Sequence, residues 1–138
     1  MRRALAVVTV LTLLCASIAL VGCTTSTPRQ DVETLYTSEW IENDMTALVS
    51  TPTCGRVEFV QYSSDDWYSV NLKDVTIADG EAYIDSLKKA GYREERRVTE
   101  DKRYEVEGDL LIVSLKGKSA KVTVQLMNNT MSITIDRR

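Results

Sequence analysis

The chain has 138 residues, enough for one modest domain, and its 17 basic and 20 acidic residues give a net charge of −3. This acidic balance excludes nucleic-acid binding, because such binding depends on dense Lys and Arg contacts to phosphates. The chain contains no histidine, which removes the commonest general base and metal ligand and excludes His-dependent triads and dyads. We therefore expect no enzyme, no metal site and no cofactor.

The N-terminus has the layout of a secretory signal peptide. Arg2 and Arg3 precede an uncharged, mostly apolar run over residues 4–21. Three alternatives remain open: an uncleaved transmembrane helix, since the run approaches the roughly 20 residues that span a bilayer; an ordinary signal peptide with an incidental cysteine after it; and a twin-arginine signal, which nothing around the arginine pair supports.

The end of this run, Leu20-Val21-Gly22-Cys23, resembles the lipobox of bacterial lipoproteins, which ends in Gly or Ala followed by Cys. The resemblance implies that residues 1–22 are a signal peptide, that cleavage falls between Gly22 and Cys23, and that the Cys23 thiol is diacylated. Two or three acyl chains anchor a protein firmly, because each buried CH₂ contributes about 0.8 kcal/mol. We expect a lipid-anchored protein on the extracytoplasmic face of the cell membrane, with Cys23 as its membrane contact.

The mature chain is predicted to begin with a flexible tether and to have few cysteines. Residues 23–39 are rich in Thr and Ser and are interpreted as the tether. The predicted signal removes two basic and no acidic residues, which leaves a net charge of −5. Cys54 is the one mature cysteine besides Cys23, so no internal disulfide forms. We interpret Cys54 as a small, partly buried side chain, with a reactive thiol or an intermolecular disulfide as alternatives.

Residues 40–138 are predicted to form a single α+β domain with two helices. A short helix is expected over residues 40–49, because apolar residues there follow helical spacing. The clearest element is a helix over residues 76–91. Thr76 and Asp79 have the spacing of a capping box, and Gly91 is the expected stop.

Alternating apolar and polar residues predict an antiparallel sheet of about six strands, in the order β-β-α-β-β-β-β, with one face covered by the 76–91 helix. The charged stretch 92–102 is interpreted as a solvated edge strand or loop. The almost continuous apolar run 110–116 predicts a central strand that is buried on both faces. The predicted strands cover residues 56–62, 67–72, 103–107, 110–116, 120–126 and 131–136.

Scattered motifs resemble those of small bacterial lipoproteins, mostly uncharacterised, that end in one domain of unknown function. The resemblance implies an extracytoplasmic location and a single domain, and it brings no activity or catalytic residue. The Pro-x-Pro that often precedes the first strand in that family is incomplete here, at Pro52-Thr53-Cys54. The matching features are Trp40 followed by Asn43-Asp44, Leu48 leading to Pro52 and Gly55, Tyr83 to Gly91-Tyr92, Tyr104, and Met131-Ser132-Ile133.

Acidic pairs are the candidates for catalysis or metal binding, and none is supported. The pairs Asp65-Asp66 and Glu94-Glu95 fall in a predicted turn and a charged strand, where carboxylates are usually solvated. Neither these pairs nor Asn43-Asp44 shows the alternating spacing of a calcium loop. We therefore predict no catalytic and no metal-binding residue.

Aromatic residues near the first predicted hairpin indicate a candidate binding surface. Along the predicted strand 67–72, Trp67, Ser69 and Asn71 alternate with Tyr68, Val70 and Leu72. Trp67 therefore lies on the open face of the sheet if the second set faces the helix. The candidate surface residues are Trp67, Tyr62 and Thr123, although grouped aromatics are more often ordinary core.

Two functions follow as hypotheses. The first is a non-enzymatic interaction or adaptor module, whose open sheet face or free edge meets an envelope protein. The alternative is a lipoprotein that binds a small molecule or a cell-wall fragment.

Overall fold

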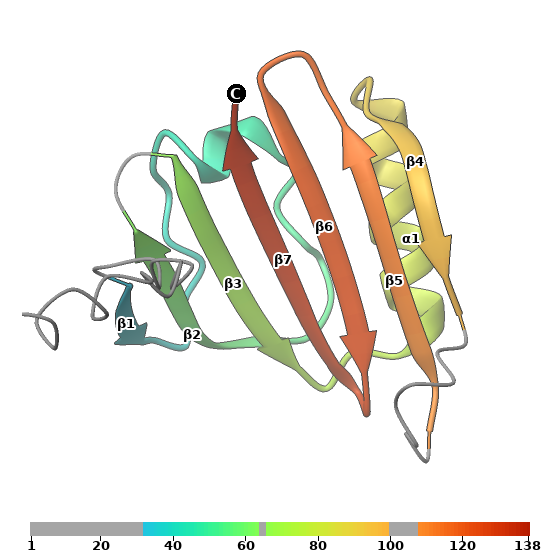
Figure 1. Ribbon diagram of the computed structural model, residues 1–138. Helices are drawn as coiled ribbons and strands as arrows, with labels where there is room; N and C mark the ends of the chain where they lie inside the picture. The colour runs from blue at the N-terminus through green and yellow to red at the C-terminus, as the bar shows by residue number, and fades with distance from the viewer. Residues whose placement is uncertain (1–31, 64–65, 100–107) are drawn as a thin grey trace, which may run out of the picture.

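The computed structural model describes residues 32–63, 66–99 and 108–138 (Figure 1). The predicted signal peptide, Cys23 and the strand predicted over 103–107 lie outside the described residues. Seven antiparallel strands form one sheet in the order β1-β2-β3-β7-β6-β5-β4, with one α-helix on one face. This architecture confirms the predicted α+β class. The elements are β1 (Glu33–Tyr36), the 3₁₀ helix η1 (Thr46–Leu48), β2 (Arg56–Ser63), β3 (Trp67–Lys73), α1 (Ile77–Lys89), β4 (Arg93–Val98), β5 (Leu110–Lys116), β6 (Ala120–Met127) and β7 (Thr130–Arg137).

β1 lies inside the segment predicted as a tether, and that prediction is wrong for these residues. β1 pairs with β2 over its whole length, from Glu33 opposite Tyr62 to Tyr36 opposite Phe59. The rings of Tyr36 and Phe59 are also in contact, with centroids 5.9 Å apart. A strand of four residues is too short to show periodicity, so only its partner strand reveals it.

The short helix predicted over residues 40–49 is reduced to the single turn η1. Asn43 and Thr46 bond reciprocally: the Asn43 N–H donates to Thr46 Oγ1 at 2.8 Å, and Asn43 Oδ1 accepts from the Thr46 N–H at 2.9 Å. The Thr46 hydroxyl also donates to the Ile41 carbonyl at 2.9 Å. These side-chain bonds compete with a helical ladder, and apolar spacing alone does not show them.

Helix α1 has the two ends that the sequence predicts. Thr76 is its N-cap and forms a complete capping box with Asp79. At the other end Gly91 has φ +97°, the Gly91 N–H donates to the Lys88 carbonyl, and the Tyr92 N–H donates to the Leu87 carbonyl, both at 3.0 Å. This is a Schellman motif. In the part of the chain that the structure describes, no helix is long and apolar enough to cross a membrane.

The core lies between the sheet and the elements on its helix-bearing face. Alternate residues of the central strands are buried there, among them Val70, Val124 and Ile133. The prediction that strand 110–116 is buried on both faces is wrong. β5 is second from the edge, and its burial alternates, with Leu111 fully covered and Ile112 half-buried on the open face.

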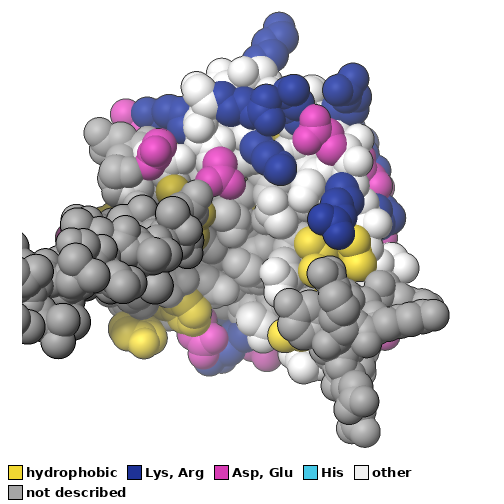
Figure 2. Space-filling model, in the orientation of Figure 1, with side chains coloured by type: hydrophobic (Ala, Val, Ile, Leu, Met, Phe, Trp, Pro, Cys, Tyr) yellow, Lys and Arg dark blue, Asp and Glu magenta, His cyan; other side chains and the backbone are white. Residues whose placement is uncertain are grey.

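The open face of the sheet is lined mainly by polar side chains. The Ser69 hydroxyl lies 3.2 Å from that of Ser132 and 3.3 Å from that of Thr134, which makes a small hydroxyl cluster across β3 and β7. Figure 2 views this face and shows uncharged groups in its middle and Lys and Arg side chains along the end where β7 finishes, near Lys116 and Lys121. The face opposite α1 is therefore largely polar.

A charge cluster joins edge strand β4 to α1. Glu94 Oε1 accepts a hydrogen bond from Arg97 Nε at 2.8 Å, and Glu94 Oε2 accepts one from Arg97 Nη2 at 3.1 Å. Lys88 Nζ lies 2.7 Å from the same Oε2. Arg97 also donates to Glu81 on the helix. The bonds from Arg97 and then Lys88 lower the pKa of Glu94 from 4.5 to about 2. The charged run is thus an edge strand tied to the helix.

This cluster predicts a defined loss of stability in acid. Because the pKa of Glu94 is lowered by folding, its contribution is present above its ordinary pKa of 4.5 and is lost as the pH falls toward about 2. Urea unfolding across this range should show a shallower decline for Glu94→Gln than for the unmodified protein. Glu95→Gln removes the same charge from the same strand and is the control. An unchanged pH dependence in Glu94→Gln would contradict the assignment.

Candidate binding pocket

The helix-bearing face of the sheet is covered by two different layers. α1 lies over β5 and β6, where Gly80 approaches Leu126 and Leu111. Over β1, β2, β3 and β7 the layer is the irregular stretch of residues 40–50, which we call the covering segment. Two tyrosine hydroxyls hold this segment in place. Tyr83 donates to the Ser50 carbonyl at 2.9 Å, and Tyr92 donates to the Leu48 carbonyl at 2.7 Å.

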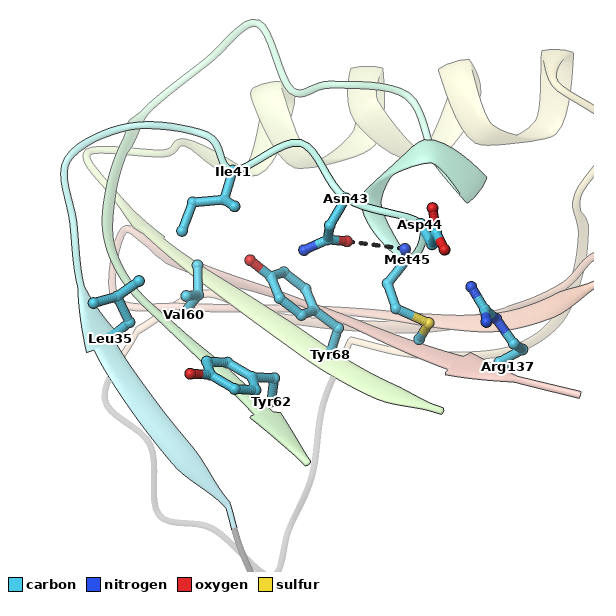
Figure 3. Close-up of a pocket in the computed structure, with 9 residues that line it drawn as sticks. All are labelled: Leu35, Ile41, Asn43, Asp44, Met45, Val60, Tyr62, Tyr68 and Arg137. Carbon is cyan, nitrogen blue, oxygen red and sulfur yellow. Dashed lines mark hydrogen bonds between the residues drawn. The ribbon is translucent and has the colours of Figure 1, made fainter. Parts of the chain in front are cut away.

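A pocket of about 610 Å³ lies between the covering segment and the sheet (Figure 3). Its volume is within the range of about 300–1,000 Å³ that is usual for small-molecule sites. Strands that are far apart in the sequence contribute to it, with β1 on one side and the end of β7 on the other. The lining residues are Leu35, Ile41, Asn43, Asp44, Met45, Val60, Tyr62, Tyr68 and Arg137.

The walls of the pocket are apolar and aromatic. Val60 is 1% exposed and Met45 is buried, so both present fixed surfaces. The rings of Tyr62 and Tyr68 stack with centroids 6.4 Å apart and planes inclined by 19°. The Tyr62 hydroxyl is occupied, because it donates to Glu33 Oε2 at 2.6 Å. This bond raises the pKa of the Tyr62 phenol.

Tyr68 brings a different kind of hydroxyl into the pocket. Its side chain is 4% exposed, and its oxygen has no hydrogen-bond partner among the described residues. Figure 3 shows this oxygen pointing toward the covering segment, on the side where Asn43 lies. Burial raises the pKa of the phenol, and the nearby Asn43 amide opposes that rise. A buried hydroxyl without a partner costs about 1–3 kcal/mol, so a group that binds to it is expected.

The backbone of the covering segment fixes the orientation of Asn43. Asn43 Oδ1 accepts from the Met45 and Thr46 N–H groups, both at 2.9 Å. These two bonds hold the oxygen end of the amide against the main chain. The other end of the amide, the NH₂ group, therefore lies nearer Tyr68 (Figure 3). The pocket therefore presents a hydroxyl and an amide donor close together within an otherwise apolar wall.

Two opposite charges line the pocket at its other side. Asp44 comes from the covering segment and Arg137 from the end of β7, and both side chains are exposed. Neither forms an ion pair with another of the described residues. Figure 3 places them together at one end of the pocket, with Ile41, Val60 and Leu35 at the other. The pocket thus runs from a charged end, past Tyr68 and Asn43, to an apolar end.

The three residues predicted as one binding surface do not share a face. Tyr62 lies on the helix-bearing face and lines the pocket. Trp67 and Thr123 are half-buried on the open face, on β3 and β6, with β7 between them. Sequence alternation placed Trp67 correctly opposite Tyr68. It did not place Tyr62, because a bulge in β2 between Val57 and Phe59 shifts the alternation along that strand.

Cys54 and the acidic side chains are weaker candidates for a functional site than the pocket. Cys54 is half-buried at a smaller pocket of about 130 Å³ beside Asp79, and burial raises the pKa of its thiol, as does the Asp79 charge. This agrees with its interpretation as a partly buried side chain. Within residues 32–63, 66–99 and 108–138, no group of three or more Cys, Asp and Glu side chains could hold a metal ion.

Comparisons of the chain with protein-family models, with curated proteins and with solved structures found no match. The resemblance to a lipoprotein family therefore stays a prediction.

Most pocket residues were missed by sequence reasoning. Ile41, Met45 and Val60 read as ordinary core, and Arg137 reads as a terminal charge. Asn43 and Asp44 were noted as part of the family resemblance and as candidate calcium ligands without the spacing of a calcium loop. The usable signal was the run of polar residues inside the apolar stretch 40–49, which a plain amphipathic helix would not need.

Loss of the hydroxyl should affect the free energy of unfolding differently at Tyr83 and at Tyr68. Tyr83→Phe leaves the Ser50 carbonyl without its donor and should lower the free energy of unfolding by about 1 kcal/mol. Tyr68→Phe removes a hydroxyl that has no partner within the described part of the fold, so it should leave that free energy unchanged or raise it by up to about 1 kcal/mol. Urea unfolding of both variants measures this. A loss in Tyr68→Phe equal to that in Tyr83→Phe would show that the hydroxyl is bonded within the fold.

Proposed function

We propose that the protein is a lipid-anchored, non-enzymatic binding protein of the cell envelope, and that its pocket takes a small molecule. The observation that carries the binding role is the Tyr68 hydroxyl, which is buried in the pocket and has no hydrogen-bond partner among the described residues. Natural folds rarely leave such a group unsatisfied, and a water, an ion or a ligand group usually bonds to it. A ligand group that bonds to this oxygen would remove the cost.

The chemistry of the pocket supports binding rather than catalysis. Its titratable groups are Asp44, Arg137 and two tyrosines whose pKa values are raised. A phenol of raised pKa keeps its proton at neutral pH and cannot act as a base. The chain has no histidine to take that role.

The lipid anchor is supported by the lipobox at residues 20–23. β1 starts at Glu33, so the tether between Cys23 and the folded domain is short. Ten extended residues reach at most about 36 Å. The domain would therefore stay near the membrane surface. The adaptor role stays a prediction, and the exposed edge residues Leu35 and Tyr36 of β1 are where a partner strand would pair.

The anchor predicts a specific mass for the mature protein. Intact mass spectrometry of the full chain purified from membranes should show loss of residues 1–22 and acyl chains on Cys23. Cys23→Ser should remain uncleaved or leave the membrane fraction. A mass that retains residues 1–22, or an unmodified Cys23, would contradict the anchor.

The binding role is tested with two uncharged probes, indole and N-cyclohexylacetamide, each of which joins an apolar ring to one hydrogen-bonding group. Calorimetry should detect binding to the unmodified protein. Tyr68→Phe should weaken it by about threefold to tenfold, the equivalent of one hydrogen bond.

Two variants place the binding on one face. Ile41→Trp fills the pocket from a half-buried wall position and should abolish binding of both probes. Thr123→Trp adds the same bulk on the open face and should leave binding unchanged. Loss of binding in Thr123→Trp but not in Ile41→Trp would move the site to the open face, and no binding of either probe would contradict the proposal.

A further inference from the structure

The charges at the pocket's mouth restrict what kind of molecule fits. Asp44 and Arg137 contribute one negative and one positive charge, and neither is paired with another described residue. A simple anion would be attracted by Arg137 and repelled by Asp44. A simple cation would be attracted by Asp44 and repelled by Arg137. A small ligand that carries both charges satisfies both side chains.

The rest of the pocket adds two requirements. An oxygen or amide group is needed beside the Tyr68 hydroxyl and the Asn43 NH₂, in the middle of the pocket. An apolar group is needed at the end formed by Ile41, Val60 and Leu35. The pocket therefore offers partners for two opposite charges, for a hydrogen-bonding oxygen or amide group and for an apolar group.

We propose that the ligand is a small zwitterion of the amino-acid type with an apolar side chain, either a free amino acid or a short peptide with free termini. Its ammonium group meets Asp44, its carboxylate meets Arg137, and its apolar side chain lies against Ile41 and Val60. In a short peptide, the amide carbonyl accepts from Tyr68 or Asn43. This assignment rests on the proposed function of the same pocket and deepens it.

The test compares leucyl-leucine with two analogues that each lack one charge, N-acetyl-leucyl-leucine and leucyl-leucine amide. Calorimetry should show leucyl-leucine binding about threefold to tenfold more tightly than either analogue, the range expected for exposed charges that also accept or donate a hydrogen bond. Free leucine is measured beside them. Whichever of leucine and leucyl-leucine binds more tightly identifies the source of the zwitterion.

Charge variants assign each end of the ligand to one residue. Arg137→Gln should remove the preference for leucyl-leucine over its amide, and Asp44→Asn should remove the preference over the acetylated form. Arg138→Gln and Glu42→Gln are the matched controls, because they remove the same charges from neighbouring exposed residues that do not line the pocket. Both controls should keep both preferences.

The failures of the two proposals are distinguishable. Equal binding of all three dipeptides, or preferences that persist in both charge variants, would overturn the zwitterion and leave the binding role standing. The same holds if the uncharged probes bind and neither leucine nor any dipeptide does. If neither the uncharged probes nor the zwitterions bind, both proposals fail.

Discussion

The structure depends on a mismatch between the width of its sheet and the width of its one α-helix. Seven strands spaced by about 4.8 Å span roughly 30 Å, whereas a helix with its side chains is about 10–12 Å wide. α1 therefore covers only the β5–β6 side. The apolar residues of β2, β3 and β7 must be buried by something else, and the irregular covering segment does this. An irregular layer packs less completely than a helix, which is why the pocket lies there.

Three tyrosines show how this layer is held and where it is left open. Tyr83 and Tyr92 donate to main-chain carbonyls of the covering segment and fix it in place. Tyr68 points at the same segment from the sheet but finds no partner among the described residues. Asn43 lies on the same side of the pocket, and its side-chain oxygen accepts from two main-chain N–H groups. The fold thus uses two of these hydroxyls to hold the covering segment, and the third is the basis of the proposed binding role.

The sequence predicted the regular elements well and the pocket poorly, for physical reasons. The capping residues Thr76 and Asp79 and the stop at Gly91 act locally, so they are readable without the fold. The alternation of β6 and β7 is equally local. β1 exists only because β2 offers it an edge. The pocket joins residues from 35 to 137, and no local pattern marks residues that meet only after folding. The anchor at Cys23 comes from a motif outside the described residues and stays a prediction.

The methionine methyl groups offer the most direct measurement of where the protein binds. Met45 lines the pocket, Met131 is buried in the core, and Met127 is half-buried on the open face. With ¹³C-labelled methionine methyls, titration with N-cyclohexylacetamide should shift the Met45 signal and leave the Met127 and Met131 signals in place. A shift confined to Met127 would place binding on the open face and contradict the account, as would no shift at saturating probe.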